Sequence, residues 1–121
     1  MCWKHEWAMA INNLECAIRH IEKAKASLEK RLAKNKKNLE RHRQSRKWNY
    51  PSLLKPIEEL VQKNTRAIEE CDTIIKILRC RQNQLYKMIQ IYGISRKEGS
   101  KRLRRLMGSY QPPELVAVEE T

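Results

Sequence analysis

The sequence predicts an all-α protein built as a long antiparallel helical hairpin of the coiled-coil type. Residues from about 3 to 47 contain no Pro or Gly, and their apolar positions alternate between spacings of four and three. A short segment with Pro51 follows, and residues 56–92 then repeat the pattern. Strong helix formers dominate both stretches. We therefore expect two helices of similar length within residues 1–94, with the chain reversing at Pro51.

The first helix is expected over about residues 3–47, with one narrow apolar seam. A mean spacing of about 3.5 residues keeps such a seam facing a partner helix along its whole length. The polar residues Lys25, Asn35 and His42 fall in the same frame, as do Asn64 and Gln82 in the second helix. Polar residues in a seam fix register and partner choice. The apolar seam positions are Trp7, Ile11, Leu14, Ile18, Ile21, Leu28, Leu32 and Leu39.

The break between the helices is expected at Trp48–Ser52. Because a residue before Pro avoids the helical region, Tyr50 and Lys55 should be extended. Pro56 suits the first turn of the second helix, which would place the acidic residues 58–59 in that turn, where they complement the helix dipole.

The second helix is expected over about residues 56–92, with Gly93 after its end. Beside its seam lies a second apolar stripe, so its apolar face is wider than one helix covers. A wide face favours more than one helical neighbour, and we expect the hairpin to be part of a larger helical bundle. The seam residues are Ile57, Val61, Asn64, Ile68, Cys71, Ile75, Leu78, Gln82, Leu85 and Ile89; the stripe is Leu60, Ala67, Ile74 and Met88, interrupted by Arg81, with Ile77 and Ile91 further round.

Setting the two seams face to face predicts a register for the hairpin. In this register Leu39 faces Asn64 and Leu14 faces Ile89, so most layers are apolar on both sides. After the hairpin, residues 95–108 are expected to form a short basic helix or linker that Gly108 ends. Residues 109–121, with two adjacent prolines, are expected to form an extended tail.

Positive charge is the strongest functional signal. The net charge is +12, and residues 30–47 hold nine basic residues and one acidic residue, Glu40. Such a surface favours phosphates, through counterion release, or an acidic protein surface like that of tubulin. Trp48 and Tyr50 beside it would allow stacking on an unpaired base. The expected binding residues are Lys30, Arg31, Lys34, Lys36, Lys37, Arg41, Arg43, Arg46 and Lys47, with a second group of Arg96, Lys97, Lys101, Arg102, Arg104 and Arg105.

Neither a metal site nor an active site is expected. Cys16 and His20 are four residues apart on one helix, but structural zinc needs four ligands, and Cys16 and Cys80 both fall on the outside of the hairpin. The sequence contains no GxSxG, Walker or HExxH motif. We therefore expect a non-enzymatic protein with no cofactor and no small-molecule substrate.

These observations favour a structural or assembly subunit that packs against other helical subunits, of its own kind or different, and engages an acidic partner. A nucleic-acid-binding helical module is the alternative. The chain has no run of roughly 20 apolar residues, and its start lacks the apolar segment of a signal peptide. We thus expect no membrane span and an intracellular location, cytoplasmic or nuclear. The expected helix-partner interface is Leu60, Ile68, Ile74, Ile75, Leu78, Leu85 and Ile89.

Overall fold

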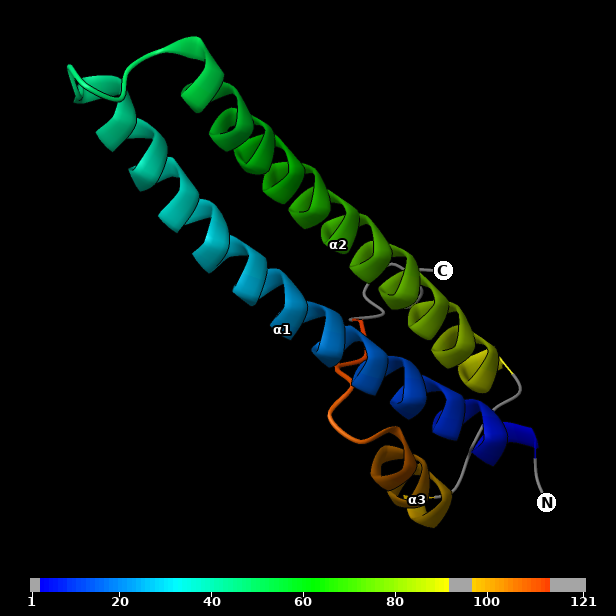
Figure 1. The fold of residues 1–121 in the computed structure, drawn as a ribbon. Helices are drawn as coiled ribbons and strands as arrows, with labels where there is room; N and C mark the ends of the chain where they lie inside the picture. The colour runs from blue at the N-terminus through cyan, green and yellow to red at the C-terminus, as the bar shows by residue number, and fades with distance from the viewer. Residues whose placement is uncertain (1–2, 92–96, 114–121) are drawn as a thin grey trace. The chain divides into compact units, whose positions relative to one another are not determined.

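The structure is a computed structural model that describes the backbone of residues 3–91 and 97–113 and the side chains of 4–91 and 101–113. It contains three helices and, within those ranges, no strand. They are α1 (Trp3–Gln44), α2 (Pro51–Ile91) and α3 (Lys97–Met107), as Figure 1 shows. The all-α class, with two long helices and a short third one, is confirmed. The chain divides into two compact units: Met1–Arg19 with Lys76–Thr121 (unit 1), and His20–Ile75 (unit 2).

Unit 2 is a pair of antiparallel helical segments joined by the turn at residues 45–50. Its predicted seam positions on α1 from Ile21 to His42 are all buried or half-buried, and nearly all the residues between them are exposed. The polar seam residues have partners on α2. The Lys25 ammonium lies 2.6 Å from an Asp72 carboxylate oxygen, and the Asn35 amide donates a 2.7 Å hydrogen bond to Asn64. The predicted seams are therefore the buried faces of this pair.

The predicted register is wrong by about one helical turn in unit 2. Asn64 pairs with Asn35, four residues before the expected Leu39. Apolar layers repeat at almost every turn, so a slip of one turn still sets apolar residues against one another. Polar partners are more selective, because a half-buried amide or ammonium without a partner costs free energy. The Asn–Asn and Lys–Asp pairs therefore determine which register is adopted.

The turn between the helices, residues 45–50, lies earlier in the chain than the predicted break. α1 ends at Gln44, and the Ser45 hydroxyl accepts hydrogen bonds from the backbone N–H groups of Lys47 and Trp48. A serine side chain that captures nearby backbone donors favours a turn over continued helix. The sequence therefore carried a stop signal at Ser45, three residues before the predicted break at Trp48.

α2 begins at Pro51, where a residue without an N–H is tolerated because no intrahelical acceptor exists for it. The Tyr50 carbonyl accepts from the N–H groups of Leu53 and Leu54. Pro56 lies inside the helix, and Lys55 is helical, so the predicted extended conformation of Lys55 is wrong. The first turn of α2 consequently holds no acidic residue, contrary to our expectation for residues 58–59.

Unit 1 packs α3 against the paired segments of α1 and α2. Its core lies among the three helices, and α3 contributes its apolar side, while its basic side chains from residue 101 onward are exposed. In this core Ile89 clusters with Ala8 and Ile11 instead of the predicted Leu14. The buried residues are Ala8, Ile11, Ile89, Leu103, Met107 and Tyr110, with Trp7, Leu85, Tyr86 and Leu106 packed against them.

Gly108 ends α3, as predicted, with a positive φ of 65°. The residues after it turn back onto the unit. Tyr110 is buried, and its hydroxyl donates a 2.8 Å hydrogen bond to the Asn83 side chain. Burial raises the pKa of Tyr110 to about 12, and the nearby Tyr86 adds to this effect. The beginning of the expected tail is therefore packed, whereas Gly93 and residues 114–121 lie outside the described residues.

Candidate partner-binding surfaces

A row of four cations follows one outer face of α1 in unit 2. Lys30, Lys34, Lys37 and Arg41 are spaced by four, three and four residues, so they lie on one side of the helix. All four side chains are exposed, and in the described part of the chain none has an ion pair or hydrogen bond. We call these four residues the basic row.

The basic row opposes the stability of the helix that carries it. Each neighbouring pair in the row sets like charges one turn apart, which costs about 0.2–0.5 kcal/mol per pair. The one acid in this stretch, Glu40, accepts a 3.1 Å hydrogen bond from Gln44 and lies beyond ion-pair distance of the described cations. The row thus contributes no described contact to the fold, so its positive charge is available to a partner.

The other predicted cations are placed less favourably for joint binding. Arg43 is 3.6 Å from Glu58, a partial neutralisation at the surface. On α3, in unit 1, the side chains of Lys101, Arg102, Arg104 and Arg105 are exposed and that of Lys97 is not described; Arg96 lies outside the described residues. The remaining exposed cations of the first predicted group are Arg31, Lys36, Arg46 and Lys47.

Two aromatic side chains are exposed at the turn of unit 2. Trp48 is 48% exposed, and Tyr50 is exposed to a similar extent. The Lys47 ammonium lies 5.4 Å from the centre of the Trp48 ring, within range of a cation–π interaction. An exposed indole beside positive charge is a suitable platform for stacking an unpaired base.

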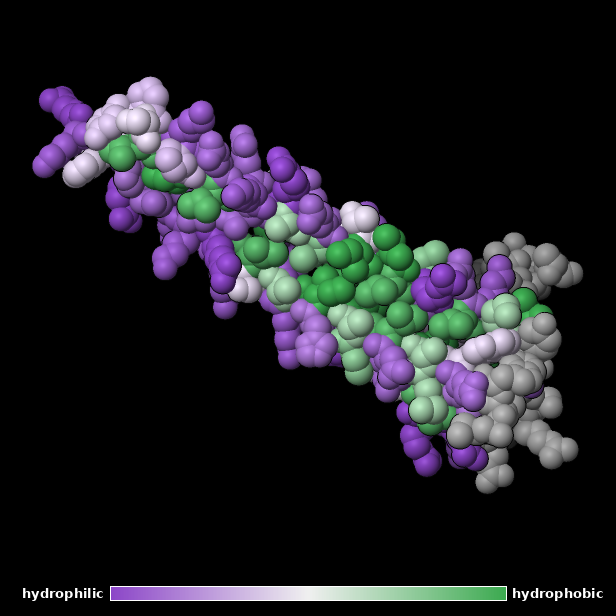
Figure 2. All heavy atoms as spheres, turned by 45° about the vertical axis from the view of Figure 1, so that its right-hand side comes forward, coloured by the Kyte–Doolittle hydropathy of each residue, from purple (hydrophilic) through white to green (hydrophobic). Residues whose placement is uncertain are grey.

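Apolar side chains also reach the surface of α2. Figure 2 shows hydrophobic side chains gathered as a patch with hydrophilic ones around it. In unit 2 Leu60 is 47% exposed and Ile74 is similarly exposed; in unit 1 Ile77 and Ile91 are 62% and 68% exposed. Ile77 and Ile91 are thus more exposed than the residues predicted for the helix-partner interface, and their place in the sequence, further round α2 from the seam, was the signal for this exposure.

The predicted helix-partner residues divide into three groups by burial. Leu60 and Ile74 are exposed, as a free interface requires. Ile89 is 1% exposed because the core of unit 1 encloses it, so we remove it from the interface. The remaining residues, which keep part of their surface accessible, are Ile68, Ile75, Leu78 and Leu85.

A buried glutamate in unit 1 is the only described acid that the structure encloses. Burial alone raises the pKa of the Glu15 carboxyl. Hydrogen bonds from Gln82 and Arg79, with the positive charges of Arg79 and Arg19, nevertheless bring it below its ordinary value. Arg79 donates at 2.6 Å and Gln82 at 2.9 Å to the same Glu15 oxygen, and Gln82 also donates to the Ile11 carbonyl. A carboxylate so fully paired and ionised serves register and packing more than proton transfer.

Cysteine and histidine do not gather in the described ranges. Cys16 and Cys80 are exposed and Cys71 is half-buried, all as free thiols. Across residues 3–91 and 97–113, no group of three or more His, Cys, Asp or Glu side chains is arranged to hold a metal ion. The described helices also include none whose length and apolar character would let it cross a membrane.

Comparison of the chain with models of protein families, with characterised proteins and with solved structures finds no match. The functional argument therefore rests on the surfaces described above.

Proposed function

We propose that this chain is a non-enzymatic assembly subunit, intracellular in location, which packs against other helical subunits through α2 and engages an acidic macromolecule through α1. The observation that carries the proposal is the basic row, whose four charges are exposed, form no ion pair within the described part of the chain and are unfavourable to their own helix. The exposed apolar residues Leu60 and Ile74 supply the second contact, because an apolar stripe beside a filled seam favours another helix.

Charge reversal on the basic row tests the contact with an acidic partner. We expect K30E/K34E/K37E to abolish binding to a poly-glutamate probe or to a DNA duplex of about 20 base pairs at moderate salt. The matched control K55E/K63E/R66E makes the same charge change at exposed residues on α2 of the same unit and should retain most of the binding. Equal losses of binding in both variants would mean that the net charge of the chain, and not a localised surface, determines binding.

Nucleic acid is the alternative partner, and exposed Trp48 beside Lys47 favours it. If phosphates bind the row, the logarithm of affinity falls linearly with the logarithm of salt, and the triple reversal lowers this slope by up to about 3. W48A should then weaken binding to oligo(dT) by about 1–3 kcal/mol while leaving duplex binding unchanged. Absence of binding to all three probes would overturn the role of the basic row.

A further inference from the structure

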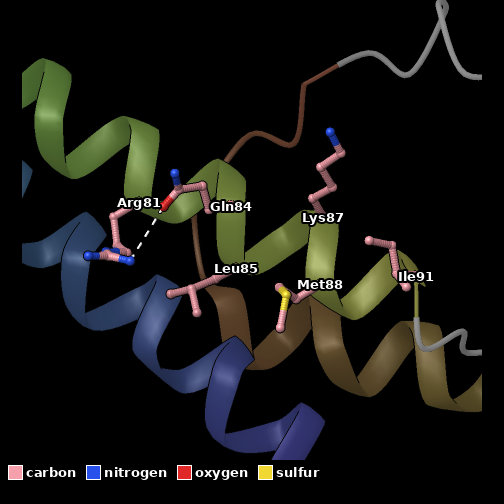
Figure 3. A pocket seen from close by; sticks show the side chains of 6 residues that line it. All are labelled: Arg81, Gln84, Leu85, Lys87, Met88 and Ile91. Atoms are coloured by element: carbon pink, nitrogen blue, oxygen red, sulfur yellow. Dashed lines mark hydrogen bonds between the residues drawn. The ribbon is translucent and has the colours of Figure 1, made fainter.

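A shallow groove lies along α2 in unit 1. Its volume is about 400 Å³, and Figure 3 shows the side chains that line it, with Arg81 at one end and Lys87 and Ile91 toward the other. Met88 and Ile91 are exposed apolar side chains, and Arg81 lies within ion-pair distance of no described carboxylate. An occupant that matches the groove is therefore apolar and brings an acidic group to Arg81. The lining residues are Arg81, Gln84, Leu85, Lys87, Met88 and Ile91.

The part of α2 that belongs to unit 2 has this chemistry on one side. Leu60 and Ala67 are seven residues apart, so they lie on the same side of the helix, and Glu70 follows them one turn later. Leu60 is 47% exposed, Glu70 is exposed, and the Glu70 carboxylate has no ion pair within the described residues. Both surfaces belong to the same helix, so a single molecule cannot bring them together, whereas two copies can.

The spacing of these residues fits a coiled-coil pair of α2 helices. From Leu60 to Ile91 they form a stripe that advances in alternating steps of three and four residues, beside the seam that α1 fills. This is the spacing of a second coiled-coil seam. Every residue of the stripe is exposed except Ala67, which is half-buried. The stripe is therefore a seam without a partner in the described part of the chain.

Charge favours one register for an antiparallel pair of such stripes. In this register Glu70 of each copy faces Arg81 of the other, and Lys63 faces Met88, whose apolar surface the lysine stem can cover. A shift of one heptad in one direction sets Lys63 against Arg81, and in the other direction it sets Glu70 against Met88. Both shifts lose the ion pair, and the first also brings like charges together.

The same register pairs the apolar residues of the stripe. At its centre Ile74 of each copy faces Ile77 of the other, and these side chains are 44% and 62% exposed in the single chain. Toward each end Leu60 of one copy faces Ile91, so it reaches the groove of the other copy. Because a two-fold axis relates the copies, each of these contacts is made twice.

We propose that α2 binds α2 of a second copy of this chain as an antiparallel pair, with Glu70 of each copy ion-paired to Arg81 of the other and Leu60 of each copy in the groove of the other. The inference rests on the assembly part of the proposed function, for which it names the helical partner and the register. The contact uses no residue of α1, so binding of an acidic macromolecule by the basic row is tested separately.

Charge exchange between the two ion-pair positions tests the contact, with the full chain followed by sedimentation equilibrium. We expect E70R and R81E each to raise the dissociation constant of the dimer about tenfold or more, because each sets like charges together at two symmetric places. The double variant E70R/R81E restores the pair with the charges reversed and should return the constant to within about threefold of the unmodified value. The control E69R changes the adjacent exposed glutamate, which lies outside the stripe, and should retain dimerisation.

Disulfide formation between copies tests the register. Ala67 of one copy faces Gln84 of the other in the proposed register, whereas Leu60 faces Gln84 only after a shift of one heptad. In a chain whose four cysteines are replaced by serine, a mixture of A67C and Q84C should give a cross-linked dimer on oxidation. A mixture of L60C and Q84C should give much less, and circular dichroism checks that every variant keeps its helicity.

The outcomes separate this proposal from the function on which it rests. A monomeric chain would overturn the α2 pair, while binding of the poly-glutamate probe or the duplex would still report on the basic row. Association that E70R/R81E does not recover, or equal cross-linking in both cysteine mixtures, would overturn the antiparallel register. Loss of that association in L60Q/I74Q would then still support assembly through α2.

Discussion

Gly108 determines the path of the chain after α3. Its φ of 65° lies in the left-handed region, and a Cβ there would come within 3.1 Å of the Asn12 side-chain carbon. Only after this turn can the Ser109 hydroxyl accept a 2.6 Å hydrogen bond from Arg19 and Tyr110 enter the core. One residue without a side chain therefore attaches the end of α3 to both long helices of unit 1.

Replacing Gly108 should loosen this attachment. We expect G108A to lower the free energy of unfolding by about 1–3 kcal/mol, since Ala at positive φ is strained and its Cβ collides with Asn12. Urea denaturation followed by circular dichroism measures the change. The control G99A, inside helix α3, should have the opposite sign, a gain of about 0.5–1 kcal/mol. Equal effects at both positions would contradict a special role for Gly108.

The Glu15 cluster makes unit 1 sensitive to acid. The pKa of Glu15 is lower in the folded protein than its ordinary value of 4.5. Its contribution to stability is therefore complete above that ordinary value. As the pH falls, the unfolded chain takes up the proton first, and the contribution is lost as the pH passes through the folded pKa.

We expect E15Q to flatten this dependence. Glutamine keeps the shape and the acceptor oxygen but does not ionise, so E15Q should be less stable than the unmodified chain at pH 7 and lose less stability between pH 6 and about pH 3. Urea midpoints across this range measure it. E22Q, which changes an exposed glutamate of α1, should retain the unmodified profile; an identical profile for E15Q would show that Glu15 does not contribute.

Single residues were the least predictable feature from sequence. Gln82 was identified because it occupies a seam position, but Glu15 stands beside the seam and looks like any solvated helix residue. Its burial depends on α2, whose residues Arg79 and Gln82 contact it and are distant in sequence. Tyr110 was likewise placed in an extended tail, since nothing local to it indicates the pocket that Asn83 and Tyr86 form.

The helices were predictable because their apolar positions repeat. Every seam residue chosen between Trp7 and His42 is buried or half-buried, which follows from periodicity alone. The register was not predictable by the same means, because a repeating pattern matches itself again after each turn. The start of α2 was misplaced because Pro51 and Pro56 both suit an early helical position, and local sequence does not choose between them.

The Asn35–Asn64 pair gives an element-scale prediction. We expect the single changes N35L and N64L each to cost about 1 kcal/mol or more, because each leaves the other amide without its partner. The double change N35L/N64L should recover this loss and add apolar burial, at the expense of a unique register. A double-mutant cycle measured by thermal unfolding gives the coupling. N38L, at an exposed site, serves as the control, and additive single effects would contradict the pairing.

At the scale of the whole molecule, the unfilled apolar stripe predicts association. We expect the chain to sediment above its monomer mass of 14.5 kDa at micromolar concentration. L60Q/I74Q should shift it toward monomer without loss of helicity, since both side chains are exposed in the single chain. T65Q/T73Q, at exposed residues of α2, should leave association unchanged. A chain that is monomeric at every concentration would contradict assembly through copies of itself.

The division of the chain has a consequence for its synthesis. Unit 2 is a continuous stretch, His20–Ile75, so all of its internal contacts are available once that stretch has left the ribosome. Unit 1 combines the first residues with the last. The α2 residues that contact Ile11 and Glu15, and the α3 residues that cluster with Ile11, are made much later. The apolar start of α1 must therefore wait, exposed, until residues up to Tyr110 emerge, and this interval is when the nascent chain is most open to chaperones or to misassembly.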